Sequence, residues 1–83
     1  MSAYVRFNLY RIPIDKECTQ ANAEFWQGGL IFPEVENLIR WYFINKWNKN
    51  FVIRVRLLGG SYPEMDIKNK KDFEKLIEKW GDL

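Results

Sequence analysis

The stretch from Pro33 to Leu58 changes its hydrophobic period midway, and this change constrains the fold more than any other feature of the chain. Apolar residues in its first half recur at the spacing of one helix face: Val35, Leu38, Ile39 and Tyr42. Pro33 suits the first turn of a helix, where its missing N–H is not needed. Residues 51–58 instead alternate between two sets of side chains, as in a strand. The sequence therefore predicts a helix over residues 33–48 that leads into a strand over residues 51–58.

A hairpin is expected after residue 58, because Gly59-Gly60 interrupts the alternation and residues 62–68 have the composition of a return strand. A three-residue loop that ends at Ser61 would place apolar residues opposite apolar residues and arginines opposite acids. A slip of one residue would mix the two faces, so this register should be the more stable one. The pairs that it predicts are Val55–Met65, Ile53–Ile67, Arg54–Asp66 and Arg56–Glu64.

The remaining elements follow from the same two patterns. Residues 3–12 alternate and predict a half-buried strand, while residues 70–80 carry apolar side chains at helical spacing and predict an amphipathic helix. Residues 15–27 fit either a short helix, capped by Asp15 and ended by Gly28-Gly29, or an irregular loop. The order of elements predicts an α+β domain with a small, mainly antiparallel sheet and helices packed on one face.

Length and composition limit the chain to a single domain. It has 83 residues, of which 47% are hydrophobic and 17% aromatic, so one small core is expected and disorder is not. The first residues lack the charged and apolar regions of a secretory signal, and no apolar run reaches the length of a membrane span. We therefore expect one compact domain over residues 1–83, in a soluble cytoplasmic protein that does not contact membranes.

The sequence argues against catalysis. It contains no histidine and only one cysteine, Cys18, which excludes Ser–His and Cys–His pairs as well as thiolate zinc sites. Neither glycine pair belongs to a phosphate-binding motif. Glu34 and Glu36 suit the start of a helix, and Glu64 and Asp66 face arginines in the predicted hairpin. We expect no enzyme activity, no metal and no small-molecule cofactor.

The predicted helix over residues 33–48 has a second apolar side. Trp41, Ile44 and Trp47 point largely away from the core-facing residues. Arg40 lies beside them. Trp and Arg dominate many protein–protein interfaces, and a monomer rarely leaves such a patch uncovered. This pattern predicts a binding surface for a protein partner, or for a second copy of the chain as a homodimer. The alternative is that residues 13–32 cover the patch as a second core layer.

The outward face of the sheet is a second candidate surface, because arginines and tyrosines are interleaved there. Such a mixture resembles, in its chemistry alone, a platform that stacks the bases of RNA or single-stranded DNA. The residues concerned are Tyr4, Arg6, Tyr10, Arg54 and Arg56, helped by Lys46 and Lys49. Phosphate binding needs uncompensated positive charge, however, and the predicted register gives Arg54 and Arg56 acidic partners. The alternative is an ordinary solvated face with cross-strand ion pairs.

The function that these patterns favour is stoichiometric binding of another protein without catalysis. Small chains of this kind often act as inhibitors, as immunity or counter-defence factors, or as accessory subunits. Binding of nucleic acid through the Arg/Tyr face is the alternative function. Salt separates the two, because affinity for nucleic acid falls steeply with ionic strength whereas an apolar interface hardly responds.

Overall fold

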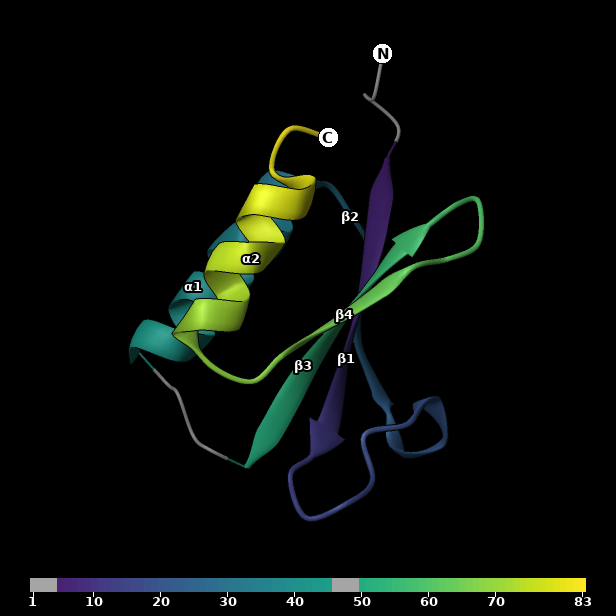
Figure 1. Cartoon of the computed structure of the whole chain (residues 1–83), viewed down its shortest axis with the longest axis vertical. Helices are drawn as coiled ribbons and strands as arrows, with labels where there is room; N and C mark the ends of the chain where they lie inside the picture. Colours follow the sequence, from purple (N-terminus) through teal and green to yellow (C-terminus); the bar gives the residue numbers. More distant parts are fainter. Residues whose placement is uncertain (1–4, 46–49) are drawn as a thin grey trace.

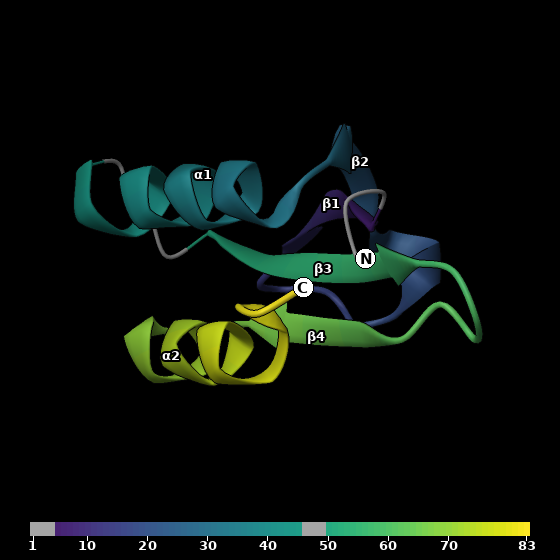
Figure 2. The same ribbon diagram turned by 90° about the horizontal axis from the view of Figure 1, so that it is seen from above.

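A four-stranded antiparallel sheet forms the centre of the computed structural model, in the strand order β2-β1-β3-β4. The structure describes residues 5–45 and 50–83, without the side chains of residues 43–45. Both helices lie on the same side of the sheet (Figure 1, Figure 2), which confirms the expected α+β architecture. The elements are β1 (Arg6–Pro13), a short 3-10 helix η1 (Gln20–Asn22), β2 (Glu24–Leu30), α1 (Phe32–Asn45), β3 (Phe51–Leu58), β4 (Glu64–Ile67) and α2 (Lys70–Trp80).

The β3–β4 hairpin has the predicted register. Residues that face each other across it are Val55–Met65, Ile53–Ile67, Arg54–Asp66 and Arg56–Glu64. The return strand is shorter than the predicted residues 62–68, since β4 begins at Glu64. In the turn, Gly59 has φ 132° and Gly60 has φ 58°, values that residues with a Cβ atom adopt only rarely. The glycine pair therefore allows the chain to reverse its direction between β3 and β4 in the predicted register.

β1 lies inside the sheet, between β2 and β3. It pairs with β3 from Arg6, opposite Leu58, to Pro13, opposite Phe51, so it extends one residue beyond the predicted end at residue 12. Residues 3 and 4 of the predicted strand lie outside the described residues. The side chain of Leu9 is fully buried. β1 therefore anchors the sheet to the core.

Residues 24–30 form an edge strand, which contradicts the helix considered for residues 15–27. A helical turn is confined to Gln20–Asn22 and is of the 3-10 type. The apolar residues of this segment fit a strand as well as a helix, and the period alone did not decide between them. Gly28-Gly29, which was interpreted as a helix stop, instead lies inside β2, where the register against β1 shifts.

This irregularity in β2 is a bulge that Asn8 of β1 completes. Gly29 has φ 66°, a conformation that suits glycine and occurs in bulges. Its backbone N–H donates a hydrogen bond to the Asn8 side-chain oxygen Oδ1 at 3.0 Å. A side chain thus supplies the acceptor that the regular strand ladder would otherwise provide.

The two helices have local start signals. α1 begins at Phe32, one residue before the predicted Pro33, and continues to Asn45; residues 46–48 of the predicted helix lie outside the described residues. α2 has the predicted limits, 70–80. It begins after Asn69, whose side chain accepts a hydrogen bond from the Asp72 N–H at 3.0 Å. This cap satisfies one of the unpaired N–H groups of the first turn.

The hydrophobic core lies between the sheet and the two helices. The ring of Phe7 contacts the rings of Phe32 and Trp80, with centroids 5.8 Å and 5.6 Å apart. Burial of each large apolar side chain contributes roughly 1.5–3 kcal/mol, so this layer carries most of the stabilising burial. Its buried members are Phe7, Leu9, Phe32, Val35, Ile39, Tyr42, Ile53, Val55, Ile67, Phe73, Leu76 and Trp80. Within the described ranges, no helix is both long and apolar enough to cross a membrane.

Candidate functional site

Trp41 lies on α1 with 47% of its surface exposed. The same helix uses another side for the core, where Val35 and Ile39 are fully buried. Arg40, next to Trp41, is exposed as well. Of the other residues predicted for this surface, Trp47 lies outside the described residues, and so does the side chain of Ile44. The described part of the predicted patch is therefore an exposed indole beside an exposed guanidinium.

Arg40 has protein partners on both sides. Its Nη2 donates to Oε2 of Glu36, one helical turn earlier, in an exposed ion pair. Its guanidinium carbon also lies 5.6 Å from the ring centroid of Phe73 on α2, which is a cation–π contact. An exposed ion pair of this kind contributes only about 0–1 kcal/mol and exchanges partners readily. Arg40 thus bridges the two helices and keeps a charge that an incoming acceptor can compete for.

Among the described residues, segment 13–32 does not seal Trp41, of which 47% stays exposed. β2 pairs with β1 at the edge of the sheet, and the preceding residues contact the face opposite the helices. Trp26 places its ring against Tyr42, with centroids 5.7 Å apart, and Tyr42 belongs to the core. This segment consequently leaves the indole of Trp41 exposed.

Arg54, on the opposite face of the sheet, is buried, with 7% of its surface exposed. Its Nε and Nη2 donate to the two carboxylate oxygens of Asp66 at 2.8 Å and 3.1 Å. Nη2 also donates to the backbone oxygen of Cys18 at 3.1 Å, and Nη1 donates to Oε1 of Gln20 at 3.2 Å. Oε1 of Glu64 lies 3.6 Å from Nη1. The guanidinium is therefore directed at acceptors within the protein and not at solvent.

The arginine and the carboxylate hold each other in the charged form. Burial alone would raise the pKa of Asp66, but hydrogen bonds from Arg54 and Cys18, with the charges of Arg54 and Lys68, outweigh burial and lower that pKa. The hydrogen bond to Asp66 raises the pKa of Arg54, although burial opposes this. Burial and the hydrogen bond to Asp66 raise the pKa of the Cys18 thiol. Cys18 is thus a poor nucleophile at neutral pH.

Two further residues of the predicted Arg/Tyr face, Arg56 and Tyr10, are also engaged. Arg56 forms an ion pair with Glu64, and its guanidinium carbon lies 5.3 Å from the ring centroid of Tyr10. Tyr10 is buried, and its ring meets that of Phe25 edge to face at 5.8 Å. Arg6 is exposed. The other predicted members, Tyr4, Lys46 and Lys49, lie outside the described residues. The structure thus brings Tyr10, Arg54 and Arg56 together, but as a neutralised cluster.

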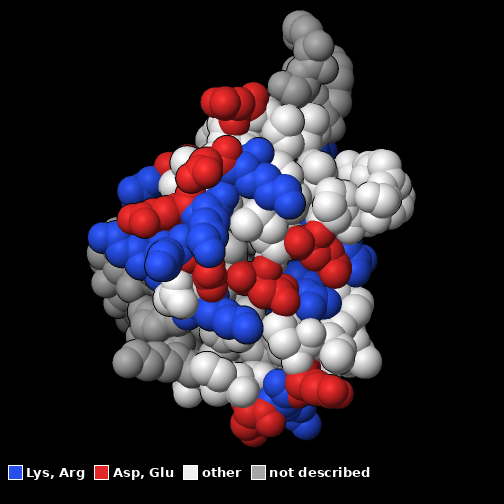
Figure 3. All heavy atoms as spheres, in the orientation of Figure 1, with Lys and Arg blue, Asp and Glu red and all other residues white. Residues whose placement is uncertain are grey.

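Charges of both signs are interleaved elsewhere too. On the face that Figure 3 shows, Lys and Arg side chains lie among Asp and Glu side chains over α2. The formal net charge of the chain is only +2. Such a surface attracts a polyanion weakly, because each phosphate contact needs a positive charge that is not already compensated. In the described part of the chain, no three His, Cys, Asp or Glu side chains gather closely enough to hold a metal ion.

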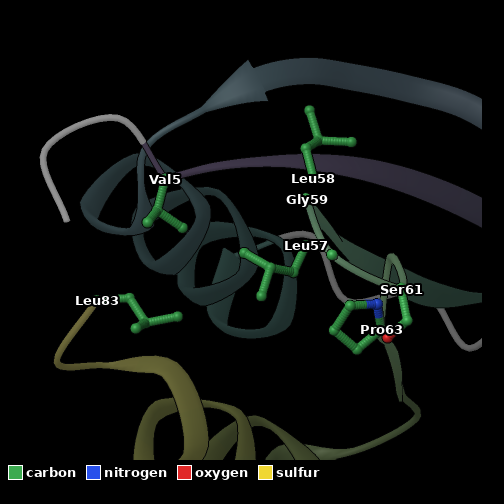
Figure 4. Close-up of a pocket in the computed structure, with 8 residues that line it drawn as sticks. Val5, Leu57, Leu58, Gly59, Ser61, Pro63 and Leu83 are labelled. Atoms are coloured by element: carbon green, nitrogen blue, oxygen red, sulfur yellow. The ribbon is translucent and has the colours of Figure 1, made fainter.

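An apolar hollow of about 400 Å³ lies beside the β3–β4 turn (Figure 4). Leu57 and Pro63 line it from the hairpin, Val5 from the residue before β1, and Leu83 from the end of the chain. None of the residues that line it has an ionisable side chain. Ser61 brings a hydroxyl to this hollow, but no side chain that lines it can act as a base to activate that hydroxyl.

Sequence reasoning missed Cys18 and Gln20 as neighbours of Arg54. It gave Arg54 one partner, Asp66, and an outward position. One signal was available, since a guanidinium has five donors and a single carboxylate cannot satisfy them all. The sequence did not indicate which segment would supply the other acceptors, because these contacts join residues far apart in the chain.

Comparison of the chain with protein-family models, with curated proteins and with solved structures gives no significant match. The surfaces described above therefore carry the functional inference through their chemistry. That chemistry is the exposed Trp41 with Arg40 on one side of the molecule and the closed Arg54–Asp66 cluster on the other.

Proposed function

We propose that this protein is a small non-catalytic binding protein that docks another protein through Trp41 and Arg40 on the outer side of α1. The observation that supports this proposal is the exposure of Trp41, an indole of which 47% remains uncovered while α1 buries another side. Tryptophan and arginine are the residue types most enriched among those that dominate protein–protein binding.

The exposed area of the Trp41 ring sets how much free energy a partner gains by covering it. Covering the exposed half of an indole removes about 100 Å² of largely apolar surface from water, which corresponds to about 2–3 kcal/mol. Arg40 adds directional contacts, since its pairing with Glu36 is weak enough to be replaced by an acceptor on the partner. One anchoring ring with a neighbouring cation suits the centre of a small interface.

The mechanism on this proposal is occlusion or scaffolding. The protein would act as an inhibitor, as an immunity or counter-defence factor, or as an accessory subunit of a larger assembly. A homodimer through the same surface is a variant in which the partner is a second copy of the chain. Sedimentation of the purified protein over a range of concentrations distinguishes the homodimer from a different partner.

A pair of matched variants tests the proposal. Trp41→Ala removes the proposed anchor, and Phe25→Ala removes another exposed ring, 61% exposed, on the other side of the sheet. We expect affinity capture from native lysate, after nuclease treatment, to recover a stoichiometric protein with the wild-type chain and with Phe25→Ala, but not with Trp41→Ala. The melting temperature of Trp41→Ala should stay close to that of the wild type.

Two outcomes would contradict the proposal. The first is that Trp41→Ala lowers the melting temperature as sharply as a core substitution such as Trp80→Ala, which would make the ring structural. The second is recovery of nucleic acid alone, lost at moderate salt, which would favour the alternative function. The structure gives that alternative less support, because Arg54 is buried and Arg56 is paired with Glu64.

A further inference from the structure

Residues 14–23, here named the strap, contact the face of the sheet opposite the helices through polar groups. The backbone oxygen of Cys18 and the side-chain oxygen of Gln20 accept hydrogen bonds from Arg54. The Cys18 thiol donates to Oδ2 of Asp66 at 3.1 Å. At the start of the strap, the Ile14 N–H donates to the backbone oxygen of Asn50 at 2.8 Å. The attachment is therefore concentrated on one guanidinium and its carboxylate.

The strap contributes no buried side chain to the fold. None of residues 14–23 is buried, and its one large apolar residue, Ile14, is 60% exposed. Other contacts are internal, such as the hydrogen bond from the Asn22 side chain to the backbone oxygen of Glu17 at 2.9 Å. The hydrophobic resistance to detaching the strap therefore comes from the sheet residues beneath it, Ile12 and Val52, and not from strap side chains.

We propose that the strap is a latch-held conformational element that opens while the sheet and helices stay folded, with Arg54 as the latch. Opening breaks the bonds from Arg54 to two neutral acceptors and the bond from the Cys18 thiol to Asp66, and water replaces these partners. The pair with Asp66 survives, because Arg54 and Asp66 belong to the same hairpin. The buried cation thus remains compensated in the open state, which is the condition for opening without unfolding.

Opening changes the surface that the protein presents. A hollow of about 280 Å³ lies between the strap and the sheet, with the buried side chains of Ile12 and Val52 in its wall. The other residues that line it are Pro13, Ile14, Lys16, Cys18 and Lys68. Release of the strap uncovers this apolar wall together with the guanidinium of Arg54. The closed and open forms therefore differ in apolar surface as well as in exposed charge.

Amide hydrogen exchange tests the proposal on the full chain. The Ile14 N–H donates to Asn50 outside the strap and therefore reports detachment, whereas the N–H groups of Asn22 and Ala23 are hydrogen-bonded within the strap and report its internal order. We expect the strap amides to exchange faster than those of β3 and to respond little to low urea, as local opening does. Gln20→Ala should accelerate exchange of the strap amides about tenfold, the effect of losing one hydrogen bond to a charged group, and leave β3 unchanged.

The control is Gln27→Ala, which removes the same side chain from an exposed position on β2. A second variant, Arg54→Lys, keeps the positive charge near Asp66 but lacks the fork that reaches both strap acceptors, so it should also accelerate strap exchange. Strap amides that exchange in step with β3 at every urea concentration would overturn the proposal. Equal acceleration of strap amide exchange by Gln20→Ala and Gln27→Ala would overturn it as well.

Discussion

The two faces of the sheet are closed by different physical means. On the helical face, α1 and α2 cover fully buried apolar side chains such as Leu9 and Val55. On the opposite face, the strap is attached through one buried cation, Arg54, and a few polar acceptors. A strand with strictly alternating residues can therefore support apolar closure on one face and polar closure on the other, since β3 supplies Val55 to one face and Arg54 to the other.

The interactions that close the two faces of the sheet differ in how they depend on direction and on water. Apolar burial is roughly proportional to area and does not depend on direction, so the helical face tolerates small shifts. The hydrogen bonds of Arg54 are directional, and water competes for each of them. We therefore expect the helical face to set the global stability and the strap face to set local opening, pH response and thiol accessibility.

The largest effect is expected on the free energy of unfolding when valine is replaced by alanine on the two faces of β3. Val55→Ala should lower the free energy of unfolding by about 2–3 kcal/mol, because it opens a cavity in a closely packed core. Val52→Ala should lower it by about 1 kcal/mol, because Val52 borders the hollow under the strap and the site can relax. Urea unfolding followed by tryptophan fluorescence measures both, and equal losses would remove the distinction between the faces.

The next effect concerns the coupling between Arg54 and Asp66. A double-mutant cycle with Arg54→Ala and Asp66→Ala should give a coupling of about 1–2 kcal/mol, because each single change leaves a partly buried charge without its partner. The matched cycle on the same strands, Arg56→Ala with Glu64→Ala, should give less than about 1 kcal/mol, since that pair is more exposed. A larger coupling in the second pair would contradict the special role of Arg54.

Acid should act on the strap face through Asp66. The pKa of this group is lower in the folded than in the unfolded chain, so its stabilising contribution is complete above the unfolded value of about 3.9 and is lost as pH falls through the folded value. Arg54, Cys18 and Lys68 are the groups that act on it. The free energy of unfolding should therefore fall less steeply below about pH 4 in Asp66→Asn than in the wild type. Asp82→Asn, which makes the same change at an exposed position after α2, is the control.

The smallest effect is a change in thiol reactivity. Folding raises the pKa of Cys18, so at pH 8 the folded chain holds less thiolate than the unfolded one. Alkylation by iodoacetamide should be a few-fold slower in buffer than in denaturing urea. Arg54→Lys should bring the rate in buffer toward the rate in urea, because strap opening separates the thiol from Asp66. An identical rate in both conditions would show that the strap does not restrain Cys18.

Much of the fold could be predicted from the sequence because local rules agree with one another there. The hairpin register follows from two demands on β3 and β4 that only one alignment meets, apolar opposite apolar and arginine opposite acid. α2 follows from a single clear helical period between Asn69 and Gly81. β2 could not be predicted in the same way. Its apolar residues fit two periods, and a glycine pair ends helices as readily as it forms bulges.

The candidate sites differ in the same respect, because some of their features depend on local sequence and others on residues far apart in the chain. The helical period showed that Trp41 lies away from the core-facing side of its helix, which is a local property, but it left open whether another segment would cover the ring. The partner of Arg54 was also predictable, because cross-strand register is set by neighbours in the hairpin. Its burial was not, since that depends on Cys18 and Gln20, which lie more than thirty residues earlier and carry no periodic signal.

The bulge in β2 has a consequence for assembly. An edge strand is normally a template onto which a strand of another molecule can add, and uncontrolled addition leads to aggregates. In β2 the backbone is out of phase at Gly28-Gly29, and the Gly29 N–H is already bound to Asn8. A foreign strand would find hydrogen-bonding groups at the wrong spacing. The sheet therefore terminates itself at β2, and complexes of this protein are not expected to form by strand addition at this edge.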